Sequence, residues 1–575
     1  METVSYSALK KLAKQEVECK KRIAVIGDCA TQQLATALRG ESIRREYPLA
    51  VLDADYDQME AQLLDPNSEV YTSKPDYILL FASFEKLKNR FYDTVPAERP
   101  QFAAREMERF TGLWQAISAN CSAKILMFDF PDAEDNIFGS YALRTPASLG
   151  FQLRKLNLLF SETIAERFPN VYPIALGNIQ TACGRAEFFE DRTWYLAKMA
   201  VRTDTLPAVA ARVLDTITAL AGRVKKCVIV DLDNTIWGGV IGDDGIDGIQ
   251  LGELGDGPAF SALQRWLLEL KRRGILLAVC SKNNDDTARE PFEKHPEMIL
   301  RLDDFAMFVA NWENKAENIR TIQKTLNIGM DSLVFLDDNP FERNLVREML
   351  PEVTVPELPE DPSAVPVYLN SLHLFEAVSF SEEDAARTAQ YQAEASRTAA
   401  QATFSSYEDY LKALEMKAEI LPFDSFHYPR IAQLTQRSNQ FNLRTVRYSE
   451  SDIAKIAQNP EYLTRYMTLK DKFGEHGLIS VVICQRQSAD TLFIDTWLMS
   501  CRVLRRGVEE CLFDAIVKMA ADAGFRYLAA EYLPTAKNKM VADFYETMGM
   551  TPLGDGKYIL ECTKHQNHTH SIKIL

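Results

Sequence analysis

The chain has 575 residues, of which 46% are hydrophobic and 25% are charged, and its net charge is −16. Since that length is several times a usual domain, about three domains are expected. The negative charge excludes a general nucleic-acid binder, because a phosphate backbone attracts a basic surface. No apolar run approaches the roughly 20 residues of a membrane helix, and no signal-peptide pattern is present. We therefore expect a cytoplasmic protein that binds neither nucleic acid nor membrane.

The cysteine pattern agrees with that expectation. Ten cysteines are scattered along the chain without a Cys-x-x-Cys pair. Such spacing predicts reduced thiols and neither a disulfide framework nor a zinc site built from cysteines.

Residues 1–205 are predicted to form the first domain. After a charged helix over residues 1–21, short apolar runs alternate with helix-like stretches. Five runs are predicted strands: Ile23–Ile26, Leu49–Leu52, Tyr77–Phe81, Lys124–Phe128 and Val171–Ile174. Strands separated by helices in this way predict a flavodoxin-like parallel sheet.

The turn after the first of these strands reads Val-Ile-Gly-Asp-Cys-Ala-Thr, which resembles the Gly-Asp-Ser nucleophile block of SGNH hydrolases. That resemblance implies that residues 1–205 have the fold of an SGNH hydrolase. The nucleophile position, however, holds Cys29, and the first histidine of the chain is His295, outside this domain. Because an SGNH triad needs a base histidine, we expect a non-catalytic or binding domain, with a Cys29 thiolate nucleophile as the alternative.

The middle domain, residues 206–360, contains the most informative stretch. Cys227–Val230 is a short apolar run typical of a buried parallel strand, and Asp231 and Asp233 follow it directly. Open α/β sheets bind ligands at this end of their strands. Two carboxylates so close repel unless a cation lies beside them, so a divalent metal is expected. One carboxylate can attack a phosphoryl group while the other handles the proton.

Three further segments follow in order. A second apolar strand ends at Ser281, whose hydroxyl can bind a phosphate oxygen. Lys315 begins an amphipathic helix, and a third apolar strand ends in the paired carboxylates Asp337 and Asp338.

This ordered set resembles the four motifs of the HAD phosphohydrolase superfamily, and it covers about the middle quarter of the chain. The longer stretches resemble its FkbH branch more narrowly. They read Asp-Leu-Asp-Asn-Thr-Ile-Trp-Gly-Gly-Val-Ile-Gly-Asp-Asp-Gly, Val-Cys-Ser-Lys-Asn and Phe-Leu-Asp-Asp-Asn-Pro. The resemblance implies a Rossmann-like α/β core.

The same resemblance implies residue roles. Asp231 would be the nucleophile that forms an aspartyl-phosphate, and Asp233 the acid/base, which also binds Mg²⁺ through its carbonyl. The metal ligands would be Asp231, Asp233, Asp337 and Asp338, with Asp338 as the preferred direct ligand; oxygen donors suit Mg²⁺. The residues that would bind phosphate are Asn234, Thr235, Ser281, Lys282, Asn283 and Lys315.

Cys280 adjoins Ser281 and offers a thiol for a thioester, although a cysteine in a buried strand is usually a packing residue. Helices are predicted over Gly257–Arg273, Lys315–Asn327 and Pro340–Leu350. Before the first of them lies only Ile236–Asp256, which is Gly-rich and too short for a large cap domain. A small cap leaves the site open, which suits a macromolecular or carrier-bound substrate.

Residues 361–417 are predicted to be a helical connector, and residues 418–575 an α+β domain. Its expected elements are strands at Leu478–Cys484, Leu492–Met499 and Tyr527–Tyr532 and a helix at Cys501–Ala521. Asn538–Met550 resembles the final helix and turn of GNAT acyltransferases.

The turn from Arg502 to Gly507 lies where GNAT proteins hold a pyrophosphate on backbone N–H groups. The resemblance implies a phosphopantetheine or CoA site made of Arg502, Val503, Arg505, Arg506, Gly507, Asn538 and Tyr545. Because Arg505 replaces the first family glycine, a purely structural relic is the alternative. His565, His568 and His570 look like metal ligands, but a frayed polar terminus is expected there.

Three functions remain open. The FkbH resemblance implies a transferase that takes a glyceryl group from 1,3-bisphosphoglycerate to the thiol of an acyl-carrier protein. The second is a phosphatase that hydrolyses a small metabolite or sugar phosphate. The third is a carrier-protein binding module in which the HAD domain is the sole enzyme.

Overall fold

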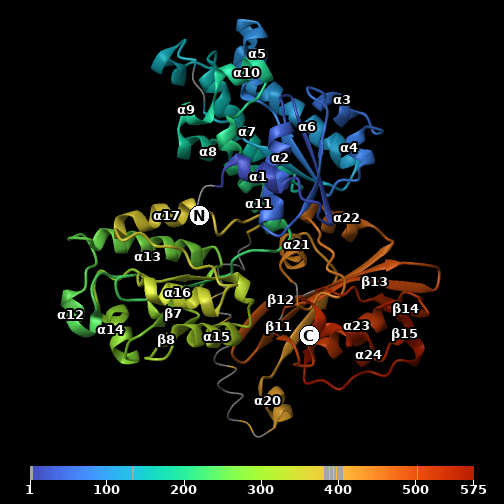
Figure 1. Cartoon of the computed structure of the whole chain (residues 1–575). Helices are drawn as coiled ribbons and strands as arrows, with labels where there is room; N and C mark the ends of the chain where they lie inside the picture. The colour runs from blue at the N-terminus through green and yellow to red at the C-terminus, as the bar shows by residue number, and fades with distance from the viewer. Residues whose placement is uncertain are drawn as a thin grey trace. The chain divides into compact units, whose positions relative to one another are not determined.

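The computed structural model describes residues 4–132, 135–380, 388, 391, 393, 397, 404, 406–438, 440–500, 503–535 and 537–575. The chain divides into two compact units, Met1–Leu220 and Ala221–Leu575. Figure 1 shows their helices and strands. Among the described residues, none of the helices combines the length and the apolar character that crossing a membrane requires.

The first unit is built on a five-stranded parallel sheet of order β2-β1-β3-β4-β5. Its strands are β1 (Lys21–Gly27), β2 (Leu49–Asp53), β3 (Tyr77–Phe81), β4 (Lys124–Phe128) and β5 (Val171–Ile174). All five residues of β3 are buried, as expected for a central strand covered on both faces. The predicted flavodoxin-like sheet is confirmed, because this strand order is the one that defines it.

Helices connect these strands. The longer ones are α2 (Gln32–Arg44), α5 (Phe84–Asp93), α6 (Phe102–Asn120), α7 (Leu149–Arg167) and α11 (Leu206–Leu220). The shorter ones are α1 (Tyr6–Leu12), α3 (Met59–Leu64), α4 (Glu69–Thr72), α8 (Leu176–Cys183), α9 (Arg185–Phe188) and α10 (Asp191–Ala197). Trp114 of α6 meets Phe160 of α7 edge to face, with ring centroids 5.7 Å apart. The sequence placed residues 206–220 in the middle domain, but α11 belongs to the first unit, where Asp215 pairs with Arg45 at 2.5 Å.

The environment of Cys29 bears on the alternative catalytic hypothesis for this unit. The side chain is fully buried, and its Sγ lies 3.9 Å from the carbonyl oxygen of Phe81. Burial, helped by the charge of Asp28, raises the pKa of the Cys29 thiol well above its usual value. A thiol held in its protonated form is a poor nucleophile, so the structure disfavours the Cys29 hypothesis.

The middle domain contains a four-stranded parallel sheet of order β8-β7-β6-β9. Its strands are β6 (Cys227–Val230), β7 (Leu276–Ser281), β8 (Met307–Ala310) and β9 (Leu333–Leu336). Its helices are α12 (Ile241–Gly248), α13 (Gly257–Arg272), α14 (Asp285–Lys294), α15 (Lys315–Leu326), α16 (Pro340–Met349) and α17 (Val365–Ser371). The mixed α/β fold is thus confirmed, although β8 and α14 were not predicted.

Successive residues of these strands alternate between two hydrophobic clusters, one on each face of the sheet. On β6, Val228 and Val230 belong to one cluster, and Cys227 and Ile229 to the other. This double burial explains why the strands read as continuous apolar runs in the sequence.

The C-terminal part forms an eight-stranded sheet of order β15-β16-β14-β13-β12-β11-β10-β17. The strands are β10 (Lys417–Leu421), β11 (Tyr462–Asp471), β12 (Gly474–Arg486), β13 (Thr491–Met499), β14 (Tyr527–Glu531), β15 (Thr551–Gly554), β16 (Lys557–Glu561) and β17 (Lys573–Ile574). The helices are α20 (Tyr407–Ala413), α21 (Tyr428–Arg437), α22 (Glu450–Gln458), α23 (Val508–Asp522) and α24 (Phe544–Thr547). The frayed terminus expected from the sequence is wrong, because β17 pairs with β10.

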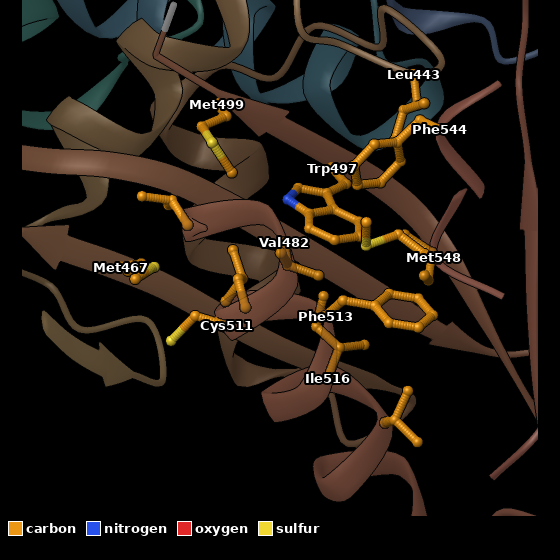
Figure 2. Packing of buried hydrophobic residues seen from close by; sticks show 14 of the residues in the cluster. Leu443, Met467, Val482, Trp497, Met499, Cys511, Phe513, Ile516, Phe544 and Met548 are labelled. Carbon is orange, nitrogen blue, oxygen red and sulfur yellow. The ribbon is translucent and has the colours of Figure 1, made fainter. Parts of the chain in front are cut away.

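Aromatic and sulfur-containing side chains hold α23 against this sheet (Figure 2). Trp497 of β13 stacks on Phe513 of α23 with ring centroids 6.0 Å apart, and it meets Phe544 edge to face at 4.9 Å. The parallel pair β13 and β14 is joined through α23, and this fixes the loop before α23 at one end of the sheet. Most of the predicted connector between residues 381 and 405 lies outside the described residues.

Candidate active site

The motif residues of the middle domain meet at the carboxyl edge of its sheet. Asp231 follows β6, Ser281 ends β7, Lys315 begins α15 just after β8, and Asp337 follows β9. The backbone N–H of Asp231 donates to the carbonyl oxygen of Leu336 at 2.9 Å, which continues the β6–β9 pairing to the site itself. The strands are all parallel, so their carboxyl ends bring these residues to one place.

Lys315 is the positive centre of the site. Its Nζ donates to Oδ2 of Asp231 at 2.7 Å and to Oδ2 of Asp337 at 2.6 Å, and the residue is 2% exposed. Burial alone would lower the pKa of Lys315, but the two carboxylates outweigh it and raise the pKa overall. The ammonium therefore stays charged. Asn314 caps α15 by accepting from the N–H of Ala316, which fixes the position of Lys315.

Three carboxylates lie close together at this edge of the sheet. Oxygen atoms of Asp231, Asp337 and Asp338 lie within 4.8 Å of one another. Burial and the charge of Asp231 raise the pKa of Asp337 to about 6, and they also raise the pKa of Asp338. Oδ1 of Asp231 is buried and has no hydrogen-bond partner. An all-oxygen group with surplus negative charge and an unpaired buried oxygen fits a hard divalent cation such as Mg²⁺.

The carboxylate of Asp233 lies outside that group of three and is held by separate donors. Oδ1 accepts from Nε1 of Trp237 and from the N–H of Ile241, each at 3.0 Å. Oδ2 accepts from Nδ2 of Asn283 at 2.8 Å. This arrangement holds the predicted acid/base side chain apart from the carboxylates of Asp231, Asp337 and Asp338 and fixes its orientation.

Several residues predicted to bind phosphate make contacts within the protein. Asn234 has a left-handed φ of 50° and accepts from the N–H of Gly239 at 2.9 Å, so it shapes the turn. The hydroxyl of Thr235 accepts from the N–H of Asp338 at 3.2 Å. Lys282 pairs with Glu342 at 2.5 Å, and Asn283 bridges Asp233 to Ser281. The structure thus places Lys315 against the carboxylates, with Ser281 at the neighbouring strand end.

The hypothesis of a thioester at Cys280 requires a correction. Cys280 has no exposed surface, and it packs with Ile229, Ala316 and Phe335 on the opposite side of β7 from Val279. Its Sγ lies 3.7 Å from the carbonyl oxygen of Lys315, and burial raises the pKa of the thiol. Because side chains alternate along a strand, the neighbour of Ser281 faces the core and not the site.

Two residues of α16 complete the site and were missed from the sequence. Nη1 of Arg343 donates to the carbonyl oxygens of Asp337 at 2.9 Å and Asp338 at 2.6 Å, and the residue is 3% exposed. Glu342 is 5% exposed and holds Lys282. The available signal was a charged pair, Glu-Arg, on the helix that directly follows the paired aspartates.

The predicted pantetheine turn is partly described. Arg502 lies outside the described residues, Val503 and Arg506 are buried, and Gly507 has a φ of 80° at the N-cap of α23. Arg505 has a left-handed φ of 64°, and its N–H donates to Oε1 of Glu509 at 2.7 Å. The carboxylate of Glu509 therefore already supplies negative charge at this helix N-terminus.

Asn538 and Tyr545, also predicted to contact pantetheine, are core residues. Nδ2 of Asn538 donates to the carbonyl oxygens of Asn442 and Leu533, each at 2.9 Å. Tyr545 is 1% exposed, and burial raises the pKa of its hydroxyl well above the usual value. Neither side chain reaches a surface at which a ligand binds, which corrects that assignment.

Comparisons with known proteins identify a matching family model and a related solved structure. A family model described as FkbH, N-terminal domain, matches residues 22–218. The solved N-terminal part of the protein BF1531 from Bacteroides fragilis, which contains a phosphatase domain complexed with Mg, is 46% identical. The alignment covers 66% of this chain and 100% of that chain, with a TM-score of 0.63. Comparison with curated proteins finds no match.

Structures with lower identity match the C-terminal part. The ribosomal-protein-S18-alanine N-acetyltransferase from Escherichia coli is 18% identical over 27% of this chain and 99% of that chain, with a TM-score of 0.20. The GNAT domain of S. lividans PAT is 20% identical over 25% of this chain and 89% of that chain, also with a TM-score of 0.20.

The parallel sheet and the carboxylates and lysine at its edge define an enzyme of the phosphatase or transferase type. The chain belongs to the FkbH family.

Proposed function

We propose that this protein is a Mg²⁺-dependent phosphoryl enzyme in which Asp231 attacks the phosphorus of a phosphorylated small-molecule substrate. The observation that carries the proposal is the position of Asp231. One of its carboxylate oxygens is bound to Lys315 at 2.7 Å, while the other is buried without a hydrogen-bond partner. A nucleophile needs such an unpaired oxygen beside a positive charge that stabilises the transferring group.

The residues divide the chemistry between them. The side chains of Asp231, Asp337 and Asp338, with the carbonyl of Asp233, would hold Mg²⁺, and the bound ion supplies positive charge to phosphoryl oxygens. Lys315 offsets charge on the same group, and the Ser281 hydroxyl donates to one of its oxygens.

Asp233 donates and accepts the proton in this reaction. As the bond from Asp231 to phosphorus forms and the bond to the leaving oxygen breaks, Asp233 donates a proton to that oxygen. Water then attacks the aspartyl-phosphate, and Asp233 takes up the proton that the water releases.

For the substrate, we propose an acyl phosphate such as 1,3-bisphosphoglycerate, with the glyceryl group passed to an acyl-carrier protein. In the transfer, the carrier thiol adds to the acyl carbon at C1, a C–S bond forms, the C–O bond to the C1 phosphate breaks, and the thiol proton goes to solvent. The phosphate at C3 has to be removed for the product to be a glyceryl group, and it is the phosphoryl group that Asp231 attacks. Support comes from large apolar side chains beside the motifs. Leu254 is 84% exposed, Trp312 70% and Phe341 68%. Leu254 lies near the end of the small cap segment, and Trp312 and Phe341 follow β8 and β9.

The phosphatase of a small metabolite or sugar phosphate is the second candidate, and the short cap is compatible with it. A third is a carrier-binding module with the middle domain as the sole enzyme. In that arrangement the first domain would be an SGNH-like unit without catalysis, which the burial of Cys29 favours. The cytoplasmic location stays a prediction.

The experiment measures phosphate release from 1,3-bisphosphoglycerate and a panel of sugar phosphates, with and without Mg²⁺ and holo acyl-carrier protein. Asp231→Asn should lower turnover by several orders of magnitude with the fold intact, while Cys29→Ser, in the first unit, should not. A carrier mass increase by a glyceryl group identifies transfer. Full phosphate release without any carrier identifies the phosphatase, and unchanged turnover in Asp231→Asn rejects the proposal.

For pantetheine, we propose that binding at the Val503–Gly507 turn requires displacement of the Glu509 carboxylate, because two anions compete for one helix N-terminus. Glu509→Gln should then tighten binding of holo carrier protein, and Arg505→Glu should weaken it. Apo carrier protein is the matched control, since it lacks the arm. Equal binding of holo and apo carrier by wild type and both variants contradicts a pantetheine site here.

A further inference from the structure

A histidine pair from the C-terminal segment converges on one carboxylate of α23, far in sequence from the motifs of the active site. Nε2 of His565 lies 2.8 Å from Oδ1 of Asp514, and Nδ1 of His568 lies 2.7 Å from the same oxygen. The other carboxylate oxygen, Oδ2, accepts from the backbone N–H of His568 at 2.8 Å. The two imidazoles and this carboxylate make three potential metal ligands, and the orientation of the carboxylate is already fixed.

The cluster is enclosed. The side chains of His565, Asp514 and His568 are 7%, 10% and 24% exposed. The ring of Phe513 packs edge to face against both imidazoles, with centroid distances of 5.4 and 6.0 Å. Side chains held in place on several sides lose little entropy when they bind a ligand, which distinguishes this cluster from histidines on a mobile terminus.

We propose that Asp514, His565 and His568 form a binding site for one transition-metal dication of the Zn²⁺ type. Two imidazoles and one carboxylate are a common ligand set for Zn²⁺, which takes a solvent molecule as its fourth ligand. The partly exposed edge of His568 provides the access for the ion and for that solvent molecule.

Distances support this assignment. One ligand atom from each residue lies within 4.8 Å of the other two. Bonds of about 2.0 Å in a tetrahedron place ligand atoms roughly 3.3 Å apart. The two N···O distances of 2.7 and 2.8 Å need to lengthen by only about half an ångström, which small side-chain rotations supply. The ion replaces the direct contacts between the two imidazole nitrogens and Oδ1 of Asp514.

The ligand types also set this site apart from the active site. Imidazole nitrogens favour Zn²⁺, Co²⁺ and Ni²⁺ over Mg²⁺, whereas the carboxylates around Asp231 suit Mg²⁺. With Mg²⁺ in excess, a softer ion should therefore bind selectively at Asp514.

Metal binding would tie the end of the chain to α23. Beside the cluster, His570 packs on Gly507, where an added β-carbon would lie 3.2 Å from the Cβ of His570. Two residues past Ser571 the chain enters β17, which pairs with β10. A metal at Asp514 thus fixes the segment that covers the Gly507 turn.

The test titrates metal-free full-length protein with Co²⁺ in excess Mg²⁺ and follows the visible absorption bands of the bound ion, then displaces it with Zn²⁺. Wild type should bind one equivalent with the intense bands of a tetrahedral site. His568→Gln and Asp514→Asn should weaken binding by more than the roughly 10–100-fold that loss of an outer-shell partner costs. His570→Gln, which leaves all three ligands in place, is the matched control.

Circular dichroism and amide exchange of residues 565–575 accompany the titration. Slower exchange of this segment on adding Zn²⁺ to wild type, and no such change in folded His568→Gln, supports the site. Absence of a Co²⁺ band in the presence of Mg²⁺, or equal affinity of all variants, overturns it. In that case the three residues are only a hydrogen-bonded clamp on the terminal segment.

Discussion

The ammonium of Lys315 lies 2.7 Å from Oδ2 of Asp231, and both side chains are almost completely buried. The same ammonium also holds Asp337 at 2.6 Å. One positive charge therefore offsets part of the charge of these carboxylates and lies beside Asp231, whose other oxygen, Oδ1, would attack phosphorus.

Replacing Lys315 should separate its effect on catalysis from its effect on the repulsion between Asp231 and Asp337. Lys315→Met should lower kcat by roughly 10²–10³, the usual cost of removing one group that stabilises charge in the transition state. The variant also leaves Asp231 and Asp337 repelling each other, so Mg²⁺ should raise its melting temperature more than that of wild type. Phosphate-release kinetics and thermal unfolding with and without Mg²⁺ measure both effects. Lys315→Arg keeps the charge and should retain the wild-type response of melting temperature to Mg²⁺.

Arg343 should act as a positioning residue, because its contacts at the site are with the backbone carbonyl oxygens of Asp337 and Asp338. Arg343→Lys loses the planar, two-way donation, so the Mg²⁺ concentration for half-maximal activity should rise roughly 10–100-fold. At saturating Mg²⁺, kcat should recover most of its wild-type value. Glu357→Gln removes an outer partner of Arg343 and leaves both carbonyl contacts, so it should change little. An unchanged Mg²⁺ dependence in Arg343→Lys would contradict this role.

Cys280→Ala tests whether a thioester forms on the sheet. Since the thiol faces Ile229, Ala316 and Phe335, its removal should cost stability through packing and leave turnover within about twofold. The expected destabilisation is about 1 kcal/mol, which is typical of a small buried group. Intact-protein mass spectrometry during turnover should show no acyl adduct on this residue. A mass increase lost in Cys280→Ala would restore the thioester hypothesis.

The sequence predicted the site best where polar side chains directly follow strands that are buried on both faces. Parallel strands covered on both faces read as apolar runs, so β6, β7 and β9 and the side chains at their ends were predictable. The first β-sheet was predictable for the same reason.

The directions in which individual side chains point were harder to predict from the sequence. That Cys280 faces the core follows from the alternation of side chains along β7, but which of the two faces carries the site is a tertiary fact. The contact between His565 and Asp514 joins residues that are distant in the sequence, so no local pattern records it. The contacts of Arg343 are local, but the charged pair Glu342-Arg343 alone does not show that the guanidinium turns back to the carbonyl oxygens of Asp337 and Asp338. The strand β8 has three half-buried residues out of four, which gives a weak period in the sequence.

The C-terminal sheet should be sensitive to acid because of a buried ionic group at the turn between β11 and β12. Asp471 accepts from Arg397 at 2.6 and 2.7 Å and from His476 at 3.0 Å, and its side chain is fully buried. Although burial alone would raise the pKa of Asp471, His476 and Arg397 lower it well below its usual value. Burial also lowers the pKa of His476.

The pKa shifts of Asp471 and His476 both make the folded sheet less stable as pH falls. A carboxyl with a depressed pKa contributes stability above the unfolded pKa of about 4 and loses it as pH falls toward the folded value. A histidine with a depressed pKa takes up its proton more readily when unfolded, so it lowers stability once pH falls below about 6.5. Amide exchange in β11 and β12 should therefore speed up as pH is lowered from 7 to 4, after correction for intrinsic rates.

His476→Gln removes the histidine step and should flatten the exchange profile between about pH 6.5 and 5, where unfolded histidine titrates. The loss below about pH 4, which belongs to Asp471, should remain. Asp471→Asn should remove that lower step and destabilise the sheet at pH 7, because breaking a buried ion pair costs about 3–5 kcal/mol. Identical exchange profiles for wild type and both variants would show that these residues do not set the acid limit of the sheet.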